Sequence, residues 1–505
     1  MARRMRNGLL VVVLVGAVVS AAAFAGAGAN AQGTSSAAST SSAASSRPNI
    51  LFLLTDDLAW NLVKYMPHVQ QMRRQGVTFG RYFVTDSLCC PSRSSIFTGR
   101  FPHDTGVFTN GGADGGFNVF HSRGEEASTF AARLQSGGYL TGMMGKYLNG
   151  YRPAAKVDGK AAYIPPGWDE WDVAGNGYPE FNYTLNENGT LVRYRNAPSD
   201  YLTDVLASKG AAFVDRAAAQ HKPFLLEIAT FAPHGPYTPA PRHANDFPGL
   251  TAPRSPAFDE ADLSDKPPWL ANHPVLTPAQ ISNIDTSFRK RAQAVEAVDD
   301  LLAKLQSELA RNGQLANTYI VFSSDNGYHM GDHRLTPGKQ TAFETDIRVP
   351  LIVTGPKVPH GVTRNQLTSN IDLYPTFVRI GKKSVPPSVD GRSLIPLLAK
   401  KPPKVWRNAV LVEHHGPNTN PSDPDRPAAG SGNPVTYEAI RTPTSTYVEY
   451  VTGDHEYYDL AKDPYELANR ASTLSTAQQQ RLHSTLAALQ SCHSGASCWK
   501  AARGK

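Results

Sequence analysis

The sequence predicts an α/β fold in which helices flank a mostly parallel sheet, followed by a smaller C-terminal subdomain of antiparallel strands and a helix. Short, nearly continuous apolar runs, typical of strands buried on both faces, occur at 49–54, 224–229 and 319–322. These runs alternate with longer segments of helical periodicity, which favours parallel pairing in one sheet. The 505 residues, 41% of them hydrophobic, suffice for a sizeable core and more than one domain.

The N-terminus carries a targeting signal. Three arginines within the first six residues precede an almost wholly apolar run over 8–25, and small residues follow as far as Ala31. This pattern predicts a secretory signal peptide over 1–31, although the apolar run is long enough that an uncleaved membrane anchor is the alternative. Residues 32–46 are mainly Ser, Ala, Thr and Gly without periodicity, which predicts a disordered tether. We therefore expect a secreted protein with no integral membrane segment after cleavage.

The charge of the chain is modest. The formal net charge of +7 falls to +4 without the three arginines of the predicted signal peptide. No run of Lys or Arg and no basic helix stands out, so we expect no nucleic-acid partner. A small positive excess is compatible with an anionic substrate but does not establish one.

The first half of the folded region contains the following expected elements. Residues 65–74 have helical spacing and stop before Gly76, and residues 127–134 have the same spacing. Residues 140–144 form an apolar strand. A long excursion rich in Gly, Pro and Asn follows, and Asn-Glu-Asn-Gly at 186–189 is its expected hairpin turn.

The second half returns to regular alternation. Residues 201–219 have helical spacing, and a proline-rich loop after the next strand precedes Thr277-Pro278-Ala279-Gln280. That tetrapeptide is a capping box with proline at the first helical position, and Gly313 ends the helix that it starts. The strand at 319–322 and an apolar segment over 348–353 complete the series.

Beyond about residue 394 the pattern changes. Short strand-like segments without intervening helices predict a small antiparallel sheet with a covering helix. We therefore expect a catalytic domain over 47–393 and an α+β subdomain over 394–505. The expected strands and helix lie at 409–413, 437–441, 447–451 and 477–489.

The chain has four cysteines in two pairs. Cys492 and Cys498 bracket a short Ser/Gly/Ala loop, which in an exported protein predicts a disulfide. A zinc site is the alternative, but only His493 offers a further ligand nearby. We therefore expect the Cys492–Cys498 disulfide.

Polar side chains stand at the ends of several expected strands. In open parallel sheets, ligands bind outside the carboxyl ends of the strands, so these side chains can converge. Asp56, Asp57, Asp325 and Asn326 offer only oxygen donors, which favour Ca²⁺ or Mg²⁺ over Zn²⁺. We expect Ca²⁺, with Mg²⁺ or Mn²⁺ as alternatives. Taken alone, the adjacent pair Asp56-Asp57 would also suit a solvated turn. The side chains are Asp56, Asp57, His234, Asp325 and Asn326.

The stretch from Ser87 to Arg100 combines the other two cysteines with a dense polar cluster. Pro91 suits the first position of a helix, which places Cys89 just before a helix N-terminus. Backbone N–H groups, the helix dipole and Arg93 would stabilise an anion there, and so would lower a thiol pKa or hold an oxyanion. The alternative is that both cysteines are small buried residues.

These residues resemble the signature of the type I, formylglycine-dependent sulfatase family. The first match is Cys89-Cys90-Pro91-Ser92-Arg93 with Thr98-Gly99-Arg100. The resemblance covers the chain from 47 to about 469 and implies an alkaline-phosphatase-like fold. Further matches in kind and order are Thr55-Asp56-Asp57, Gly145-Lys146, Pro233-His234, Asp325-Asn326-Gly327, and Lys339 followed by Arg348-Val349-Pro350.

The resemblance also implies site roles. It implies that a formylglycine-generating enzyme converts Cys89, and not Cys90, to formylglycine. One place departs from the family pattern, since many relatives carry His where this chain has Leu148, and Asn149 is a partial replacement. The implied metal ligands are Asp56, Asp57, Asp325, Asn326 and the modified Cys89, and the implied sulfate and nucleophile contacts are Arg93, Lys146, His234 and Lys339.

The implied reaction begins when one hydroxyl of the hydrated formylglycine attacks sulfur and the alcohol leaves. Lys339 and His234 are the candidates for protonating the leaving oxygen. Because Lys339 would lie beside a divalent cation and Arg93, we expect its pKa to be lowered.

The expected substrate class depends on a resemblance to one branch of the sulfatase family. The segments 89–93, 145–149 and 181–185 look most like the N-acetylglucosamine-6-sulfatase and heparan-type branch, which implies a sulfated sugar, with aryl sulfates also possible. Two alternatives remain open. One is a phosphodiesterase or phosphonate hydrolase of the same superfold, and the other is a non-catalytic secreted binding protein in which Cys89 stays unmodified.

Overall fold

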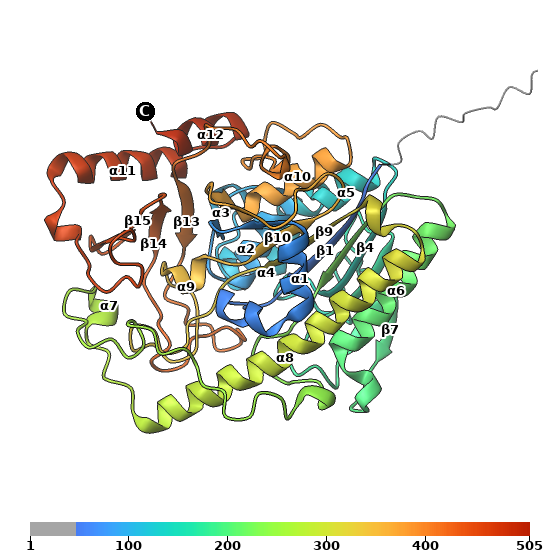
Figure 1. The fold of residues 1–505 in the computed structure, drawn as a ribbon, viewed down its shortest axis with the longest axis horizontal. Helices are drawn as coiled ribbons and strands as arrows, with labels where there is room; N and C mark the ends of the chain where they lie inside the picture. Colours follow the sequence, from blue (N-terminus) through green and yellow to red (C-terminus); the bar gives the residue numbers. More distant parts are fainter. Residues whose placement is uncertain (1–46, 505) are drawn as a thin grey trace, which may run out of the picture. The chain divides into compact units, whose positions relative to one another are not determined.

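Within residues 47–504, which this computed structural model describes, ten strands form one sheet (Figure 1). Their order is β11-β2-β10-β9-β1-β8-β4-β5-β6-β7. The predicted signal peptide (1–31) and tether (32–46) lie outside the described residues, and both stay predictions.

The four central strands are parallel, as the sequence predicts. β1 (Asn49–Thr55) lies between β9 (Thr318–Ser324) and β8 (Phe224–Ala229), and β8 also pairs with β4 (Leu140–Lys146). Parallel strands end on the same edge of the sheet, so the segments that follow β1, β4, β8 and β9 meet there.

The outer strands make the sheet mixed. β5 is parallel to β4, β6 and β7 form the predicted hairpin, and β10 runs antiparallel to β9. A separate pair is formed by β3 and β12. The bounds are β2 (Val77–Phe79), β3 (Tyr82–Phe83), β5 (Glu170–Ala174), β6 (Thr184–Glu187), β7 (Thr190–Arg193), β10 (Leu351–Thr354), β11 (Val362–Arg364) and β12 (Thr368–Ser369).

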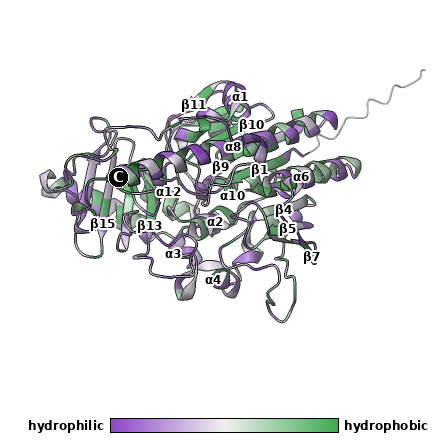
Figure 2. Ribbon diagram, turned by 90° about the horizontal axis from the view of Figure 1, so that it is seen from below, coloured by the Kyte–Doolittle hydropathy of each residue, from purple (hydrophilic) through white to green (hydrophobic). Residues whose placement is uncertain are grey.

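The sheet is buried on both faces because its central strands are apolar on both. Ile50, Phe52 and Leu54 of β1 pack into one core, whereas Leu51 and Leu53 pack into the other. All five side chains are fully buried, which explains why β1 is a continuous apolar run rather than an alternating one. In Figure 2, where hydrophobic residues are green, β1 and β10 are both coloured as mainly hydrophobic strands.

Helices cover the two faces (Figure 1). One core takes buried side chains from α1 (Pro67–Gln75), α6 (Leu202–Ala219) and α8 (Pro278–Arg311). The other takes them from α2, α5 and α10. The bounds of the remaining helices of the larger part are α2 (Cys89–Thr98), α3 (Pro102–Thr105), α4 (Gly116–Ser122), α5 (Phe130–Gln135), α7 (Pro268–Ala271), α9 (Glu344–Ile347) and α10 (Leu373–Ile380).

The helix starts show how local sequence sets the elements. The capping box at α8 is confirmed, since the Thr277 side chain accepts a hydrogen bond from Gln280 N while the Gln280 side chain accepts one from Thr277 N. The predicted helix at 127–134 is wrong in its start, because Thr129 caps α5 by accepting a hydrogen bond from Ala132 N. The residues before Thr129 form a separate 3-10 turn.

The C-terminal part contains the predicted antiparallel sheet, which has four strands. The predicted disulfide between Cys492 and Cys498 is present. It links the segment after α11 to the first turn of α12, a helix that the sequence did not indicate. The domain boundary at 393/394 stays a prediction. The bounds are β13 (Val410–His414), β14 (Tyr437–Arg441), β15 (Ser445–Tyr450), β16 (His455–Asp459), α11 (Thr476–Gln490) and α12 (Gly495–Arg503).

Among residues 47–504, no helix combines the length and the apolar composition needed to span a bilayer.

Gly145 offers a test of the packing of β4 against β8. Its φ is +97°, and a Cβ there would lie 2.0 Å from the Ala229 carbonyl oxygen. Gly145→Ala must therefore separate the strands as well as bear the backbone strain of about 1–3 kcal/mol. We expect a clearly lower free energy of unfolding in urea denaturation, accompanied by displacement of the neighbouring Lys146.

Gly189→Ala is the matched control. Gly189 has a φ of +93°, but a Cβ added to it would meet no atom within 4 Å, so this variant bears only the backbone strain. Equal losses of stability in the two variants would contradict the proposed clash with Ala229.

Candidate active site

The edge of the sheet gathers the predicted site residues. Asp56 and Asp57 follow β1, Lys146 ends β4, His234 follows β8, and Asp325 and Asn326 follow β9. Each of them is at most 8% exposed. The convergence at the carboxyl ends of parallel strands is therefore confirmed.

Cys89 is the first residue of α2, and Leu88 is its N-cap. The predicted start at Pro91 is wrong by two residues, because proline is tolerated throughout the first turn, where N–H groups lack intrahelical partners. The Sγ atom of Cys89 lies 3.2 Å from Asp56 Oδ1 and 2.9 Å from Lys339 Nζ. Cys90, in contrast, lies in the hydrophobic core.

The environment of Cys89 opposes a thiolate. Complete burial raises the pKa of its thiol well above the usual value, and the carboxylates of Asp425 and Asp56 add to the rise. The expectation of a lowered thiol pKa is therefore wrong, because it counted the helix N-terminus and Arg93 but not burial or the nearby carboxylates. An unmodified Cys89 is poorly suited to act as a nucleophile.

Three buried carboxylates each have a cationic partner. Asp56 Oδ2 lies 2.5 Å from Lys146 Nζ, and Asp57 Oδ1 lies 2.6 Å from Lys339 Nζ. Asp325 Oδ2 accepts a hydrogen bond from Arg93 Nε at 2.7 Å. Removing either partner of such a buried pair leaves an uncompensated charge, so each pair fixes two side chains in place.

The pKa values of Asp56 and Asp325 are shifted in opposite directions. Burial raises the pKa of Asp56 more than Lys146 lowers it. Burial also acts on Asp325, but Arg93, Lys146 and Lys339 together hold the pKa of Asp325 below its usual value. The Asp325 carboxyl therefore loses its proton more readily than the Asp56 carboxyl does.

The residues fit a divalent cation. One ligand atom from each of Asp56, Asp57, Cys89 and His234 lies within 4.8 Å of the others. Asn326 Oδ1 is buried without a hydrogen-bond partner, as expected for an oxygen donor that completes such a set. Carboxylate and amide oxygens are the ligands of Ca²⁺, Mg²⁺ and Mn²⁺. His234 lies in the cluster although the sequence analysis did not count it as a ligand.

Asp425 is a site residue that the sequence analysis missed. Its Oδ1 lies 2.6 Å from His234 Nε2 and 2.7 Å from Lys339 Nζ. It belongs to the loop between β13 and β14, so the C-terminal part of the chain contributes to the site. The only local signal is a pair of aspartates in a Pro- and Asn-rich loop, which does not by itself indicate a site.

Asp425 also changes the expectation for Lys339. Burial alone would lower the pKa of Lys339, but the carboxylates of Asp425 and Asp57 raise it well above its usual value. The protein groups around Lys339 therefore raise its pKa, and the lowering expected beside a divalent cation stays a prediction.

Tyr178 and Asn110 were also missed. The Tyr178 ring centroid lies 5.0 Å from Lys146 Nζ and 4.4 Å from the His234 ring centroid. Asn110 accepts a hydrogen bond from Cys90 N and donates one to Asp425 Oδ2. Both residues lie in irregular segments where no sequence pattern marks them. Tyr178 packs against Lys146 and His234, and Asn110 positions Asp425.

The departure from the family pattern is visible in the structure. Leu148 is 3% exposed and lies in the hydrophobic core. Asn149 Nδ2 lies 3.4 Å from Tyr178 Oη. Asn149 therefore reaches the site through Tyr178.

Comparisons with known proteins agree with this geometry. The sulfatase family model matches residues 48–381, and the model described as N-sulphoglucosamine sulphohydrolase, C-terminal, matches residues 331–492. The N-acetylglucosamine-6-sulfatase of Homo sapiens is 37% identical over 480 residues, which cover 90% of this chain and 86% of that protein.

Two solved structures have the same fold. One is a protein in complex with its substrate D-glucosamine-2-N,6-O-disulfate, with a TM-score of 0.71 and 24% identity, covering 88% of this chain and 97% of that chain. The other is the phosphonate monoester hydrolase of Silicibacter pomeroyi, with a TM-score of 0.67 and 22% identity, covering 86% and 93%. At these identities the likeness concerns the fold alone.

Asp325→Asn tests the cation site. The amide retains an oxygen for Arg93 but removes one of three carboxylate charges, so the cation is undercompensated. We expect metal affinity to fall at least about 10–100-fold, the loss typical when a partner of a metal ligand is removed. Elemental analysis for calcium, magnesium and manganese after dialysis measures the effect.

Asp215→Asn is the control, since Asp215 is 44% exposed and pairs with Arg311. An unchanged metal content in Asp325→Asn, with the fold retained, would refute the assignment of Asp325 to the cation site.

Proposed function

Because the chain belongs to the sulfatase family and is a sulfuric ester hydrolase, we propose that it removes sulfate from a sulfated sugar such as N-acetylglucosamine 6-sulfate. The name of the human relative and the disulfated glucosamine bound in a structural neighbour support this substrate class. The observation that carries the proposal is Cys89, which is buried at a helix start with a lysine amine 2.9 Å from its sulfur. We also expect turnover of aryl sulfates.

The proposal includes two groups that the chain must acquire. A formylglycine-generating enzyme would convert Cys89 to formylglycine, and a divalent ion, Ca²⁺ with Mg²⁺ or Mn²⁺ as alternatives, would be held by the residues named below. When present, the hydrated formylglycine supplies a hydroxyl nucleophile and the ion supplies positive charge. The proposed ion ligands are Asp56, Asp57, Asp325, Asn326 and the modified residue 89.

The fixed cations prepare the site for sulfate oxygens. Arg93 is held by the Asp325 carboxylate and by the Lys146 carbonyl at 3.0 Å, and its Nη2 is buried without a partner. Lys146 is held by Asp56 and the Tyr178 ring. Cations that are already oriented in a dry site stabilise developing negative charge without a cost of reorganisation.

Lys339 is the proposed proton donor to the leaving alcohol. It is the cation nearest to residue 89, and its two carboxylate partners keep it protonated. His234 shares Asp425 with it and is the second candidate. An entering sulfate competes with Asp425 for these two side chains, so Asp425 must release at least one of them.

We also propose that the protein is secreted, on the strength of the predicted signal peptide and tether, which together precede the catalytic fold. Secretion would bring the enzyme to sulfated sugars outside the cell and would suit the Cys492–Cys498 disulfide.

A phosphonate or phosphodiester hydrolase is the second candidate function. The observation that favours it is the shared fold with the phosphonate monoester hydrolase. A buried cluster of cations binds tetrahedral phosphorus and sulfur oxyanions alike, so the fold does not discriminate between them.

Matched substrates test the proposed function. We expect kcat/KM for N-acetylglucosamine 6-sulfate to exceed that for the 6-phosphate by at least tenfold, or about 1.4 kcal/mol in activation free energy. A higher kcat/KM for the phosphate, or for a phosphonate ester, would contradict the proposed sulfatase activity and support a phosphonate or phosphodiester hydrolase.

Two cysteine variants are the controls for the same assay. Cys89→Ala should abolish hydrolysis, whereas Cys90→Ala, which alters a core residue, should retain most of it. Equal losses of hydrolysis in the two variants would contradict the assignment of the nucleophile to residue 89. If the wild type bound the sulfated sugar but did not hydrolyse it, the protein would be a binding protein.

The acid role of Lys339 is tested by leaving-group dependence. If Lys339 protonates the departing oxygen, Lys339→Ala should reduce kcat/KM for a sugar sulfate far more than for nitrophenyl sulfate, whose phenolate leaves unprotonated. Lys462→Ala, at a lysine that is 84% exposed, is the control. Similar fold-losses on both substrates would show that Lys339 only anchors sulfate.

A further inference from the structure

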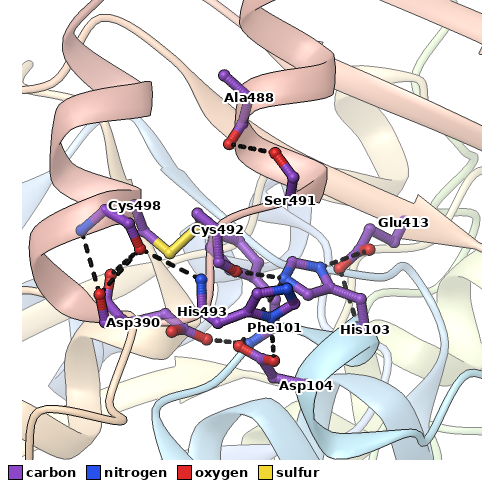
Figure 3. The surroundings of a disulfide bond; sticks show 12 residues. Phe101, His103, Asp104, Asp390, Glu413, Ala488, Ser491, Cys492, His493 and Cys498 are labelled. Carbon is purple, nitrogen blue, oxygen red and sulfur yellow. Dashed lines mark hydrogen bonds and ion pairs between the residues drawn. A yellow bond between two sulfur atoms is a disulfide. The ribbon is translucent and has the colours of Figure 1, made fainter.

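A second cluster of ionisable side chains lies outside the active site, around the disulfide (Figure 3). His103 and Asp104 belong to α3, and His493 belongs to the disulfide loop between α11 and α12. Figure 3 shows Asp104 and the two histidines close together, with Asp390 beside them. Neither the fold nor the proposed reaction accounts for this concentration of groups.

Two carboxylates in the cluster each have one oxygen without a hydrogen-bond partner, although Asp390 Oδ2 accepts a hydrogen bond from Phe101 N at 3.0 Å. Asp104 Oδ2 and Asp390 Oδ1 are buried and accept no hydrogen bond. Asp390 is 4% exposed. Burial, together with the charge and contact of Asp104, raises the pKa of Asp390 to about 8. Two facing carboxylates without a proton or a cation between them are unfavourable.

Histidine nitrogens lie on the same side. His493 Nδ1 is 2.6 Å from Asp104 Oδ1, and His103 Nε2 is 3.8 Å from Asp104 Oδ2. One ligand atom from each of these three residues lies within 4.8 Å of the others. A tetrahedral zinc ion holds its ligand atoms roughly 3.3 Å apart, so small side-chain shifts suffice.

His103 already has the outer partner that metal-bound histidines typically have. Its Nδ1 lies 2.8 Å from Glu413 Oε1, which orients the ring and leaves Nε2 on the side of Asp104. In the structure, Nε2 donates to the Cys492 carbonyl at 2.8 Å. Metal binding would replace that hydrogen bond and release its proton.

We propose that His103, Asp104 and His493, completed by Asp390, bind a divalent transition-metal ion of the zinc class. Imidazole with carboxylate ligands favours zinc over calcium, which distinguishes this site from the oxygen-rich active site. The ion fastens the disulfide loop to α3. The inference does not depend on the proposed substrate.

Zinc titration of the full-length mature protein tests this site. Calcium is kept in excess to saturate the active-site residues, and bound zinc is measured by equilibrium dialysis with elemental analysis. We expect the wild type to bind about one more zinc ion per chain than His493→Gln, and zinc to raise the Tm of the wild type only. His493 is 67% exposed, so its substitution should not prevent folding.

Two further variants sharpen the result. Asp390→Asn should also lose the zinc-dependent rise in Tm, because it removes the carboxylate whose Oδ1 has no hydrogen-bond partner. His483→Gln, at an exposed histidine of α11 that pairs with Glu449, should bind zinc as the wild type does. Equal zinc binding by His493→Gln and the wild type, or no zinc binding by either, would overturn the proposal and leave a shared proton between Asp104 and Asp390.

Discussion

The candidate active site depends on the neutralisation of three buried carboxylates. Asp56, Asp57 and Asp325 are at most 1% exposed, and charges buried in this way are unfavourable unless they are paired. Lys146, Lys339 and Arg93 provide the pairing. Lys339 also lies 2.9 Å from Cys89 Sγ, so the contacts that balance the buried charge also hold the cations of the proposed reaction.

The parallel sheet makes this arrangement possible. β1 and β9 pair in register from Asn49 with Thr318 to Thr55 with Ser324, so Asp56, Asp57, Asp325 and Asn326 leave the sheet side by side. α2 then brings Cys89 and Arg93 to the same edge. The backbone of Asp57 at this edge is strained, since its φ is 65° although it is not glycine.

Much of this was predictable from the sequence, for a physical reason. Strands such as β1 and β8 are apolar on both faces and end abruptly in polar residues. A few consecutive residues therefore suffice to predict both the strand and the polar side chains at its carboxyl end. The start of α2 was misplaced because Pro91 fits any position of the first turn. Asp425 and Tyr178 could not be predicted. They reach the site because long irregular segments fold back toward it, and such segments have no sequence periodicity from which their path could be predicted.

Asp425 brings the C-terminal part of the chain into contact with the candidate site. It comes from the loop of the C-terminal sheet and contacts both His234 and Lys339, so the site is complete only when the C-terminal part is in place. The proposed reaction depends above all on the chemistry of residue 89, since a buried thiol with a raised pKa is a poor nucleophile.

The mass of the tryptic peptide 82–93 from the active, purified protein tests that point most directly, and Cys90 in the same peptide is an internal control. We expect fragmentation to show an aldehyde oxygen at residue 89 in place of the thiol sulfur, and an intact thiol at Cys90. An intact, alkylatable thiol at Cys89 in a preparation that hydrolyses sulfate esters at its full rate would contradict the proposed nucleophile.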